Sequence, residues 1–206
     1  MAYTWAMLRG ALLDRDGVLL LPDEDAFYQA AVRMAAHGAG LERALNALAR
    51  TQREALEAVR LLRVRSLEEE ESFWLAQARG LVQALRLPFG PEDLLAAWPY
   101  YRFLKPAPGA LGLLRALKGR GLKVGVLSNT LPSLRESLAY HGLDRYVDGF
   151  FASCSLGVAK PDPRAFLLAL EALGLAPEET LYLDDNPENV QVALELGMKA
   201  QVHALS

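Results

Sequence analysis

Two acidic residues with one residue between them follow a short apolar stretch near the start of the chain. Gly10–Leu13 is expected to be a strand, and Asp14, Arg15, Asp16 and Gly17 come directly after it. If the extended geometry persists, Asp14 and Asp16 point to the same side, because alternate residues of a strand share a face. Two close carboxylates repel each other unless a cation or a proton compensates them. A hard divalent cation would do so, and Mg²⁺ prefers few carboxylates together with water and phosphate oxygens. A simple turn is the alternative interpretation.

A second polar group follows the apolar stretch Leu122–Leu127, which we expect to be a buried strand. Ser128 and Asn129 come directly after it. A hydroxyl and an amide at the end of a strand can hold phosphate oxygens without adding charge, because both offer hydrogen-bond donors. Capping of the helix expected to begin near Pro132 is the alternative interpretation.

A lysine and two adjacent acids supply the remaining polar groups. Lys160 offers a positive point charge for phosphate and for a carboxylate cluster, although a solvated surface lysine is the alternative. Asp184 and Asp185 follow the apolar stretch Thr180–Leu183. Adjacent acids at a strand end are costly unless they bind something positive. One of them can bind a metal ion while the other orients Lys160, and a helix N-cap cluster would also account for them.

Short apolar stretches alternate with helical patterns over the C-terminal half of the chain. We expect strands at 10–13, 122–127, 180–183 and 200–204, and helices at about 109–118, 132–140, 163–173 and 187–196. This alternation predicts an α/β fold with a mostly parallel sheet. We expect all four polar groups at the ends of apolar strands. Because ligands bind at the carboxyl ends of the strands in such sheets, these groups should meet at one site.

The segment from about residue 20 to residue 100 has helical patterns and no convincing strand. These patterns begin near Ala26, Leu41, Ser66 and Pro91. The acidic run Glu68–Glu71 is expected to be a solvated first turn, favoured by the helix dipole. The sequence therefore predicts an all-helical insertion between the first strand and the rest of the sheet.

The composition limits which binding partners and which cellular compartment can be expected for this protein. The chain has 206 residues and a net charge of −3 without a long basic run, which argues against nucleic acid as a partner. No stretch approaches the roughly 20 apolar residues that a membrane span needs. Residues 1–13 lack the pattern of a secretory signal, and the single Cys154 fits a reducing compartment. We therefore expect a cytoplasmic protein, a monomer or a homodimer, that does not bind membranes.

The order and spacing of the four polar groups resemble the haloacid dehalogenase-like hydrolase superfamily. The first motif of that family, Asp-x-Asp-Gly followed by Thr or Val, is matched at 14–18, and the segment 158–198 is similar throughout. The resemblance implies a Rossmann-like parallel sheet in a three-layer α/β/α core, made of residues 1–19 and 101–206. The helical segment 20–100 resembles the small helical cap that one subgroup inserts between its first and second motifs.

The resemblance also implies a role for each polar residue. Asp14 would be the nucleophile that forms an aspartyl-phosphate, and Asp16 the general acid and base. Mg²⁺ would be held by Asp14, by the main-chain carbonyl of Asp16 and by Asp185. Phosphate oxygens would be bound by Ser128, Asn129 and Lys160, with Lys160 also counted among the catalytic residues. Asp184 would orient Lys160. The implied activity is that of a magnesium-dependent phosphatase acting on a small phosphorylated metabolite.

Three alternatives stay open within this scaffold. A haloacid dehalogenase of the family lacks the second acid of the first motif, so Asp16 favours phosphoryl transfer. A sugar phosphomutase has the same motifs. A non-catalytic binding protein would be expected to lose a motif acid, and none is missing here.

Arg15 departs from the apolar residue usual at that position in capped relatives. It is expected either to contact a second anionic group of the substrate or to form a surface ion pair.

The cap is where substrate specificity is expected to lie. Candidate contacts in it, each also compatible with a core or surface position, are Tyr28, Arg33, His37, Trp74 and Arg79.

Overall fold

A five-stranded parallel sheet forms the centre of the part of the chain that the computed structural model describes, residues 7–203. Its spatial order is β5–β4–β1–β6–β7, with β1 in the middle. The strands are β1 (Gly10–Leu13), β4 (Lys123–Ser128), β5 (Gly149–Ala152), β6 (Thr180–Asp184) and β7 (Lys199–Val202). Every neighbouring pair runs parallel, so the carboxyl ends of all these strands lie along one edge of the sheet.

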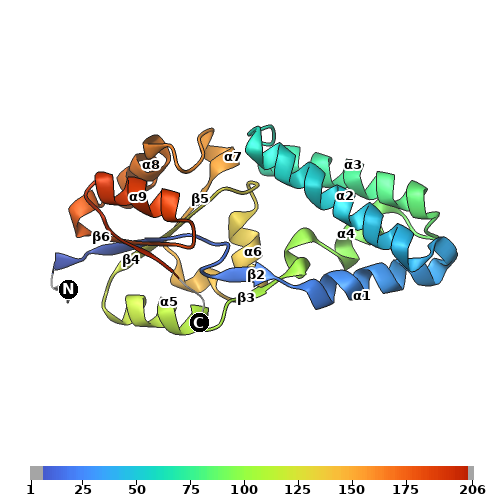
Figure 1. Cartoon of the computed structure of the whole chain (residues 1–206), viewed down its shortest axis with the longest axis horizontal. Helices are drawn as coiled ribbons and strands as arrows, with labels where there is room; N and C mark the ends of the chain where they lie inside the picture. Colours follow the sequence, from blue (N-terminus) through green and yellow to red (C-terminus); the bar gives the residue numbers. More distant parts are fainter. Residues whose placement is uncertain (1–6, 204–206) are drawn as a thin grey trace.

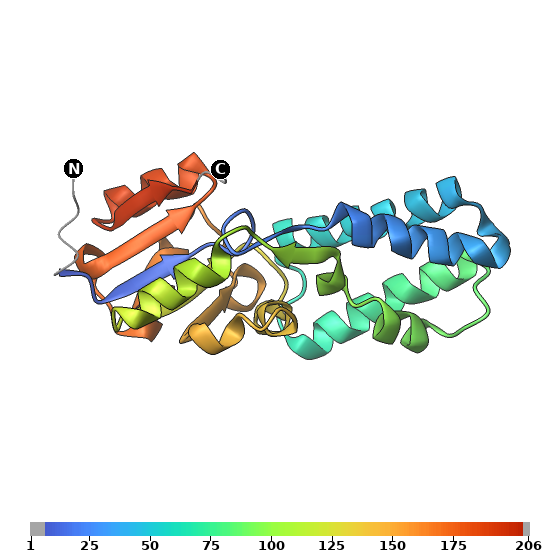
Figure 2. The same cartoon turned by 90° about the horizontal axis from the view of Figure 1, so that it is seen from below.

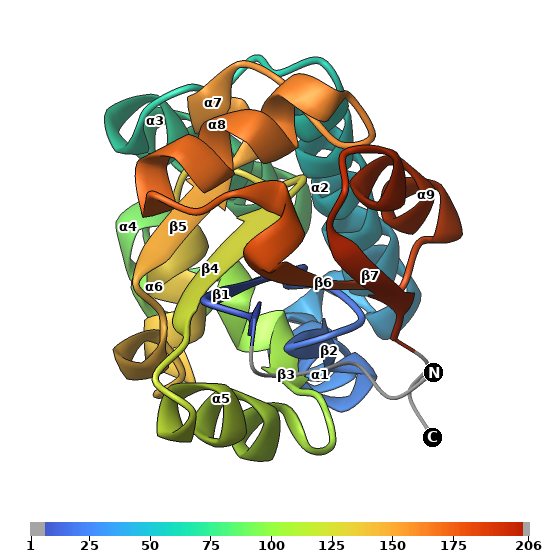
Figure 3. The ribbon, with the colours of Figure 1, turned by 90° about the vertical axis from the view of Figure 1, so that its left-hand side faces the viewer.

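Helices cover both faces of this sheet. One face packs against α5 (Ala110–Gly119) and α6 (Leu134–Tyr140), and the other against α8 (Pro163–Leu173) and α9 (Pro187–Glu195). Figure 3 shows α5 on one side of the strands and α8 and α9 on the other. Because successive side chains of a strand alternate between faces, Ala11 and Leu13 belong to the first core and Leu12 to the second. The predicted Rossmann-like three-layer α/β/α core is confirmed.

The segment between β1 and β4 is largely helical and lies to one side of the sheet. It contains α1 (Glu24–Met34), α2 (Leu41–Arg60), α3 (Leu67–Leu85) and α4 (Pro91–Ala97). A π-helical turn, Ala35–Ala39, links α1 to α2. Figures 1 and 2 show these four helices together, beyond the carboxyl-terminal edge of the sheet.

A two-stranded antiparallel ribbon joins this helical segment to the sheet. It consists of β2 (Leu20–Pro22) and β3 (Leu104–Pro106), paired through Leu21 and Lys105. The helices have an apolar core of their own, separate from the two cores of the sheet and built around small residues and leucines such as Ala31, Ala44 and Leu81. Division of the chain into a core and a cap stays a prediction, which this arrangement fits.

The expected elements differ from the observed ones in a few places. The strands β2, β3 and β5 and the short helix α7 (Ser153–Leu156) were not predicted. The last strand ends at Val202, earlier than the expected 200–204, and residue 204 lies outside the described residues. Residues 1–6 and 204–206 of the predicted core are also outside them. Within residues 7–203, every helix is too short or too polar to cross a membrane.

Candidate active site

Three adjacent strands bring polar residues to one edge of the sheet. Ser128 is the last residue of β4, Asp184 is the last residue of β6, and Asp14 directly follows β1, which lies between them. The strands themselves are apolar and enclosed by helices on both faces, so the chain first meets polar surroundings where each strand ends. This topology places the three side chains close together, although Asp14 and Ser128 are 114 positions apart in the sequence.

The ammonium group of Lys160 lies between two of these carboxylates. Its Nζ atom is 2.9 Å from Oδ1 of Asp14 and 2.7 Å from Oδ2 of Asp184. The Lys160 side chain is 1% exposed, and those of Asp14 and Asp184 are 10% and 0% exposed. Removing one partner of a buried ion pair strongly destabilises the folded protein, because the other charge is left buried without compensation. The three side chains therefore depend on one another.

The loop that carries Lys160 is held by Asn129, and it does not follow a strand. Helix α7 lies between the end of β5 at Ala152 and this loop, so the expectation that all four polar groups leave strand ends was wrong for Lys160. The Asn129 side chain donates from Nδ2 to the main-chain oxygen of Lys160 at 2.8 Å. Its Oδ1 accepts from the Lys160 main-chain N–H at 2.9 Å. Asn129, which directly follows β4, thus fixes the position of the Lys160 main chain.

Asp184 is surrounded by hydrogen-bond donors. Its Oδ2 accepts from Lys160, from the Tyr182 hydroxyl and from Nδ2 of Asn189, and its Oδ1 accepts from the Asn186 main-chain N–H at 2.8 Å. Burial opposes ionisation of Asp184. The Lys160 ammonium and these hydrogen bonds outweigh burial and hold the pKa of Asp184 below its usual value. With four donors already bound, Asp184 has few lone pairs left for a metal ion.

Asp185 lies against the turn that follows Asp14. A Cβ atom placed on Gly17 would be 2.2 Å from Oδ2 of Asp185, and Gly17 has a φ of +76°. Only glycine fits this turn, because the carboxylate occupies the space of a side chain and the backbone is left-handed. Burial, followed by the nearby charge of Asp184, raises the pKa of Asp185.

The carboxylates of Asp14, Asp184 and Asp185 form a cluster that suits a divalent cation. One oxygen from each lies within 4.8 Å of the others. The donor set consists of oxygen atoms, which hard cations such as Mg²⁺ prefer. Since Asp184 is already occupied by donors, the carboxylates of Asp14 and Asp185 fit the ion best. The cluster does not include the Asp16 carboxylate. The residues present therefore fit magnesium.

Asp14 is a buried carboxylate with two other acidic side chains, Asp16 and Asp184, close to it. Burial raises the pKa of Asp14 to about 7; Lys160 opposes this rise, and the charges of Asp184 and Asp16 add to it. Oδ1 accepts from the Arg15 main-chain N–H at 2.7 Å and pairs with Lys160. Among the described residues, no hydrogen bond or ion pair is found at Oδ2.

Ser128 has a buried hydroxyl without a hydrogen-bond partner among the described residues. The residue is 1% exposed. Leaving a buried hydroxyl unpaired costs about 1–3 kcal/mol, so such a group usually marks a strained position or a missing ligand. Here it lies at the end of β4, at the same edge of the sheet as Asp14.

Arg15 is buried and pairs with Asp16. Its Nε donates to Oδ1 of Asp16 at 3.0 Å and its Nη2 to Oδ2 at 2.8 Å. Nη1 lies 3.5 Å from the Tyr100 hydroxyl and 3.4 Å from Oγ of Ser137. The Arg15 side chain is 7% exposed, whereas that of Asp16 is 49% exposed. The expectation of a surface ion pair was right about pairing and wrong about the surface, because Tyr100 and Ser137 cover the guanidinium.

Glu70 is a residue of this region that sequence analysis missed. It is 3% exposed, so the expectation that the run Glu68–Glu71 is solvated was wrong at this position. Its carboxylate accepts from Nε1 of Trp74 at 3.0 Å and from the main-chain N–H and hydroxyl of Ser133. Glu70 therefore ties α3 of the helical segment to the start of α6. Its partner Trp74 was among the candidate cap contacts, and it lines the cavity next to the site.

One family model matches almost the whole chain. It is described as haloacid dehalogenase-like hydrolase and covers residues 8–197.

Curated relatives match over shorter segments. Phosphatase MT3486 of Mycobacterium tuberculosis is 38% identical over 122 residues, which are 58% of this chain and 56% of that protein. Phosphoserine phosphatase of Thermus thermophilus is 40% identical over 95 residues, which are 45% of this chain and 38% of that protein. The chain thus spans about half the length of the first relative and less of the second.

Solved structures share the fold over nearly the whole chain. A HAD family enzyme from Bacteroides thetaiotaomicron, in complex with magnesium and inorganic phosphate, has a TM-score of 0.65 and 21% identity. That alignment covers 96% of this chain and 95% of the enzyme. A dehalogenase crystal structure has a TM-score of 0.59 and 26% identity, with coverage of 97% and 85%.

Proposed function

Because this chain belongs to the haloacid dehalogenase-like hydrolase family, we propose that it is a magnesium-dependent phosphatase acting on a small phosphorylated metabolite. The observation that carries the proposal is the position of Lys160, 2.9 Å from Asp14 and 2.7 Å from Asp184, at the carboxyl edge of the sheet. A buried ammonium group beside a buried carboxylate offers a nucleophile and a binding charge for phosphate at the same point.

The first half of the reaction transfers the phosphoryl group to Asp14. Oδ2 of Asp14 attacks phosphorus, and an O–P bond forms as the bond from phosphorus to the leaving oxygen breaks. Asp16 acts as the general acid that supplies a proton to that oxygen, and the alcohol leaves. The Ser128 hydroxyl and the Lys160 ammonium hold the phosphoryl oxygens, whose charge they stabilise.

The second half returns the enzyme to its starting state. Asp16, now a carboxylate, takes a proton from a water molecule as the water oxygen attacks the phosphorus of the aspartyl-phosphate. The bond between phosphorus and Asp14 breaks, and inorganic phosphate leaves. Arg15 holds both oxygens of Asp16 in a fork, which fixes the orientation of the carboxylate. A carboxylate has about four lone-pair sites, so two stay available for the substrate.

Magnesium is the proposed cofactor. The proposed ligands are the carboxylates of Asp14 and Asp185 and the main-chain carbonyl of Asp16, with Asp184 orienting Lys160. When bound there, the ion would neutralise charge on the transferring phosphoryl group. Asn129 acts in this scheme mainly by positioning Lys160, because its amide is already bonded to the main chain of that residue.

The helical segment would serve as a cap over this site. It contacts the core through Glu70 and Ser133 and through the ribbon of β2 and β3. A cap of this kind would open to admit substrate and close to exclude bulk water. Residues 20–100 would then form the cap and the remaining residues the core.

Magnesium-dependent release of inorganic phosphate tests the proposal. We expect release from p-nitrophenyl phosphate and from at least one member of a panel of phosphorylated metabolites, with loss of activity when the metal is chelated. Asp14→Asn should abolish turnover while the protein stays folded. Asp25→Asn, on the exposed side of α1, is the matched control and should keep full activity. Full activity of Asp14→Asn would exclude Asp14 as the nucleophile.

The same assays separate the alternatives. Conversion of one sugar phosphate into its isomer without release of phosphate would indicate a phosphomutase. Release of halide from a haloacid, with no activity on phosphate esters, would indicate a dehalogenase. Absence of any turnover in protein that has bound magnesium would indicate a binding protein on this scaffold.

A further inference from the structure

A cavity of about 390 Å³ lies between the helical segment and the core, next to the proposed site. At one end it is lined by core residues, Arg15, Asp16 and residues 129–131, and the rest of its wall comes from the helical segment and the chain that follows it. This volume falls in the range of about 300–1,000 Å³ that is usual for small-molecule pockets. It is more than twice the roughly 150 Å³ of an engineered cavity that holds benzene. The leaving group of a substrate bound at Asp14 would extend into this space.

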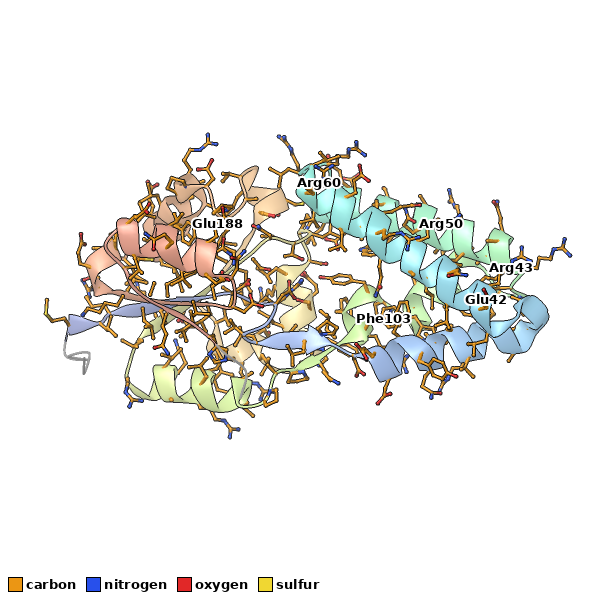
Figure 4. The ribbon with its side chains drawn as sticks, in the orientation of Figure 1. Glu42, Arg43, Arg50, Arg60, Phe103 and Glu188 are labelled. Atoms are coloured by element: carbon orange, nitrogen blue, oxygen red, sulfur yellow. The ribbon has the colours of Figure 1, made fainter. Side chains whose placement is uncertain are left out.

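The wall of the cavity is mainly apolar. Aliphatic side chains from three of the helices, Met34, Leu48 and Leu81, are almost fully buried beneath it. Aromatic side chains contribute further apolar surface, among them Trp74 and Trp98. Phe103, labelled in Figure 4, lies on the side of the cavity close to β3. A wall of this kind favours an occupant that is itself apolar, because its transfer from water into the cavity is favourable.

The cavity offers no free positive charge. Of the described residues that line it, Arg15 and Asp16 are the charged ones, and they are paired with each other. The arginines of α2 labelled in Figure 4, Arg43, Arg50 and Arg60, are exposed and do not line the cavity. A second carboxylate or phosphate on the substrate would therefore find no positively charged partner along this wall, and its transfer from water into the cavity would be costly.

From these observations we propose that the substrate is a phosphate monoester of an apolar alcohol, alkyl or aromatic, without a second charged group. The cavity holds the apolar part of the ester, and the phosphate lies at Asp14 and Lys160. This assignment rests on the proposed phosphatase function and adds the class of substrate to it.

A series of unbranched alkyl phosphates from ethyl to octyl tests the assignment by kinetics. Each methylene group that enters the cavity should raise kcat/KM by about fourfold, the factor that corresponds to its transfer free energy, until the cavity is full. Phosphoserine and phosphoglycolate, which carry additional charges, should be poorer substrates than butyl phosphate. Equal kcat/KM across the alkyl series, or a preference for the charged esters, would overturn the assignment and leave the phosphatase function standing.

A variant that fills the cavity tests whether the cavity causes the preference for long alkyl chains. Ala55 lines it from α2 and is half-buried, so Ala55→Trp adds bulk where the fold can tolerate it. The ratio of kcat/KM for octyl phosphate over ethyl phosphate should fall by roughly tenfold or more. Ala172→Trp, on the exposed face of α8, is the matched control and should keep the ratio of the unsubstituted protein. An unchanged ratio in Ala55→Trp would place the alkyl chain elsewhere.

Binding of alkylphosphonates, which cannot be hydrolysed, gives a readout that does not depend on turnover. Trp74 and Trp98 line the cavity, so octylphosphonate should change the tryptophan fluorescence and should bind at least about tenfold more tightly than ethylphosphonate. Equal binding of the two would contradict the assignment. If no ester is hydrolysed but octylphosphonate binds preferentially, the phosphatase function fails while the apolar ligand class stands.

Discussion

Oε2 of Glu70, on helix α3, accepts a hydrogen bond from the main-chain N–H of Ser133 with a distance of 2.7 Å between the two atoms. Oε1 of the same carboxylate accepts from the Ser133 hydroxyl at 2.6 Å and from Nε1 of Trp74 at 3.0 Å. Ser133 directly precedes α6, and the Tyr100 hydroxyl donates to its main-chain oxygen. A single buried carboxylate thus connects the helical segment to the core beside the cavity.

Removal of this carboxylate should loosen the helical segment. Glu70→Ala leaves the buried main-chain N–H of Ser133 and the partly buried indole N–H of Trp74 without an acceptor, at a cost of about 1–3 kcal/mol for each group that water cannot reach. We expect a Tm roughly 5–10 °C lower and a red shift of the tryptophan fluorescence as Trp74 becomes hydrated. Thermal melts and emission spectra measure both effects.

The neighbouring acid provides the control for Glu70. Glu71 is exposed on the same helix and has no hydrogen bond or ion pair among the described residues. Glu71→Ala should change the Tm by no more than about 1–2 °C. Equal Tm values for the two variants would mean that the Glu70 bonds do not hold the segment in solution.

Ser128→Ala should separate ligand binding from stability. The hydroxyl is buried and unpaired, so its loss removes a desolvated group, and the Tm should stay the same or rise. The proposed bond to a phosphate oxygen should be lost, and KM and the inhibition constant of phosphate should rise by roughly 10-fold or more.

Thr180→Val is the contrasting variant, because the Thr180 hydroxyl donates to the Ala176 carbonyl at 2.8 Å. It should lower the Tm and leave KM unchanged; the same pattern in Ser128→Ala would disprove the phosphate contact.

The sequence predicted the sheet core well because the signals there are local. The strands β1, β4 and β6 are apolar stretches that end in polar residues, and each lies within two residues of its expected position. The carboxyl ends of parallel strands share one edge, which is why Asp14, Ser128 and Asp184 could be expected to meet. The roles assigned to these side chains stay predictions.

The features that sequence analysis missed depend on distant contacts or on very short elements. The strands β2 and β3 have three residues each, too few to show a period of two. The burial of Glu70 follows from its contact with Ser133, 63 positions away. The burial of Arg15 follows from Tyr100 and Ser137, which are 85 and 122 positions away. No local pattern marks residues whose partners come from another part of the chain.

Lys160→Met should weaken both the fold and the chemistry. Methionine has a similar length, but without the ammonium group Asp14 and Asp184 stay buried without a compensating charge, at a cost on the order of 3–5 kcal/mol. With chelator present the Tm should fall by roughly 10 °C, and added Mg²⁺ should restore part of it. We expect kcat/KM to fall by about 10²- to 10³-fold. Lys105→Met, at an exposed position of β3, is the control. Activity within about twofold of the unsubstituted protein would remove Lys160 from the site.

Asp14 should make the stability of the metal-free protein depend on pH. Its pKa is raised by burial from the ordinary value of 3.8 to about 7, so the folded state binds the proton more tightly than the unfolded state. The stability that protonation supplies is complete below pH 3.8 and is lost as the pH rises to about 7. Asp14→Asn removes this titration, and groups common to both proteins largely cancel in the comparison. In chelator, the Tm of the unsubstituted protein should fall by roughly 5 °C more than that of Asp14→Asn between about pH 5 and pH 8. An equal fall in the two proteins would show that Asp14 is ionised at both pH values and is not held in the buried, negatively charged surroundings described here.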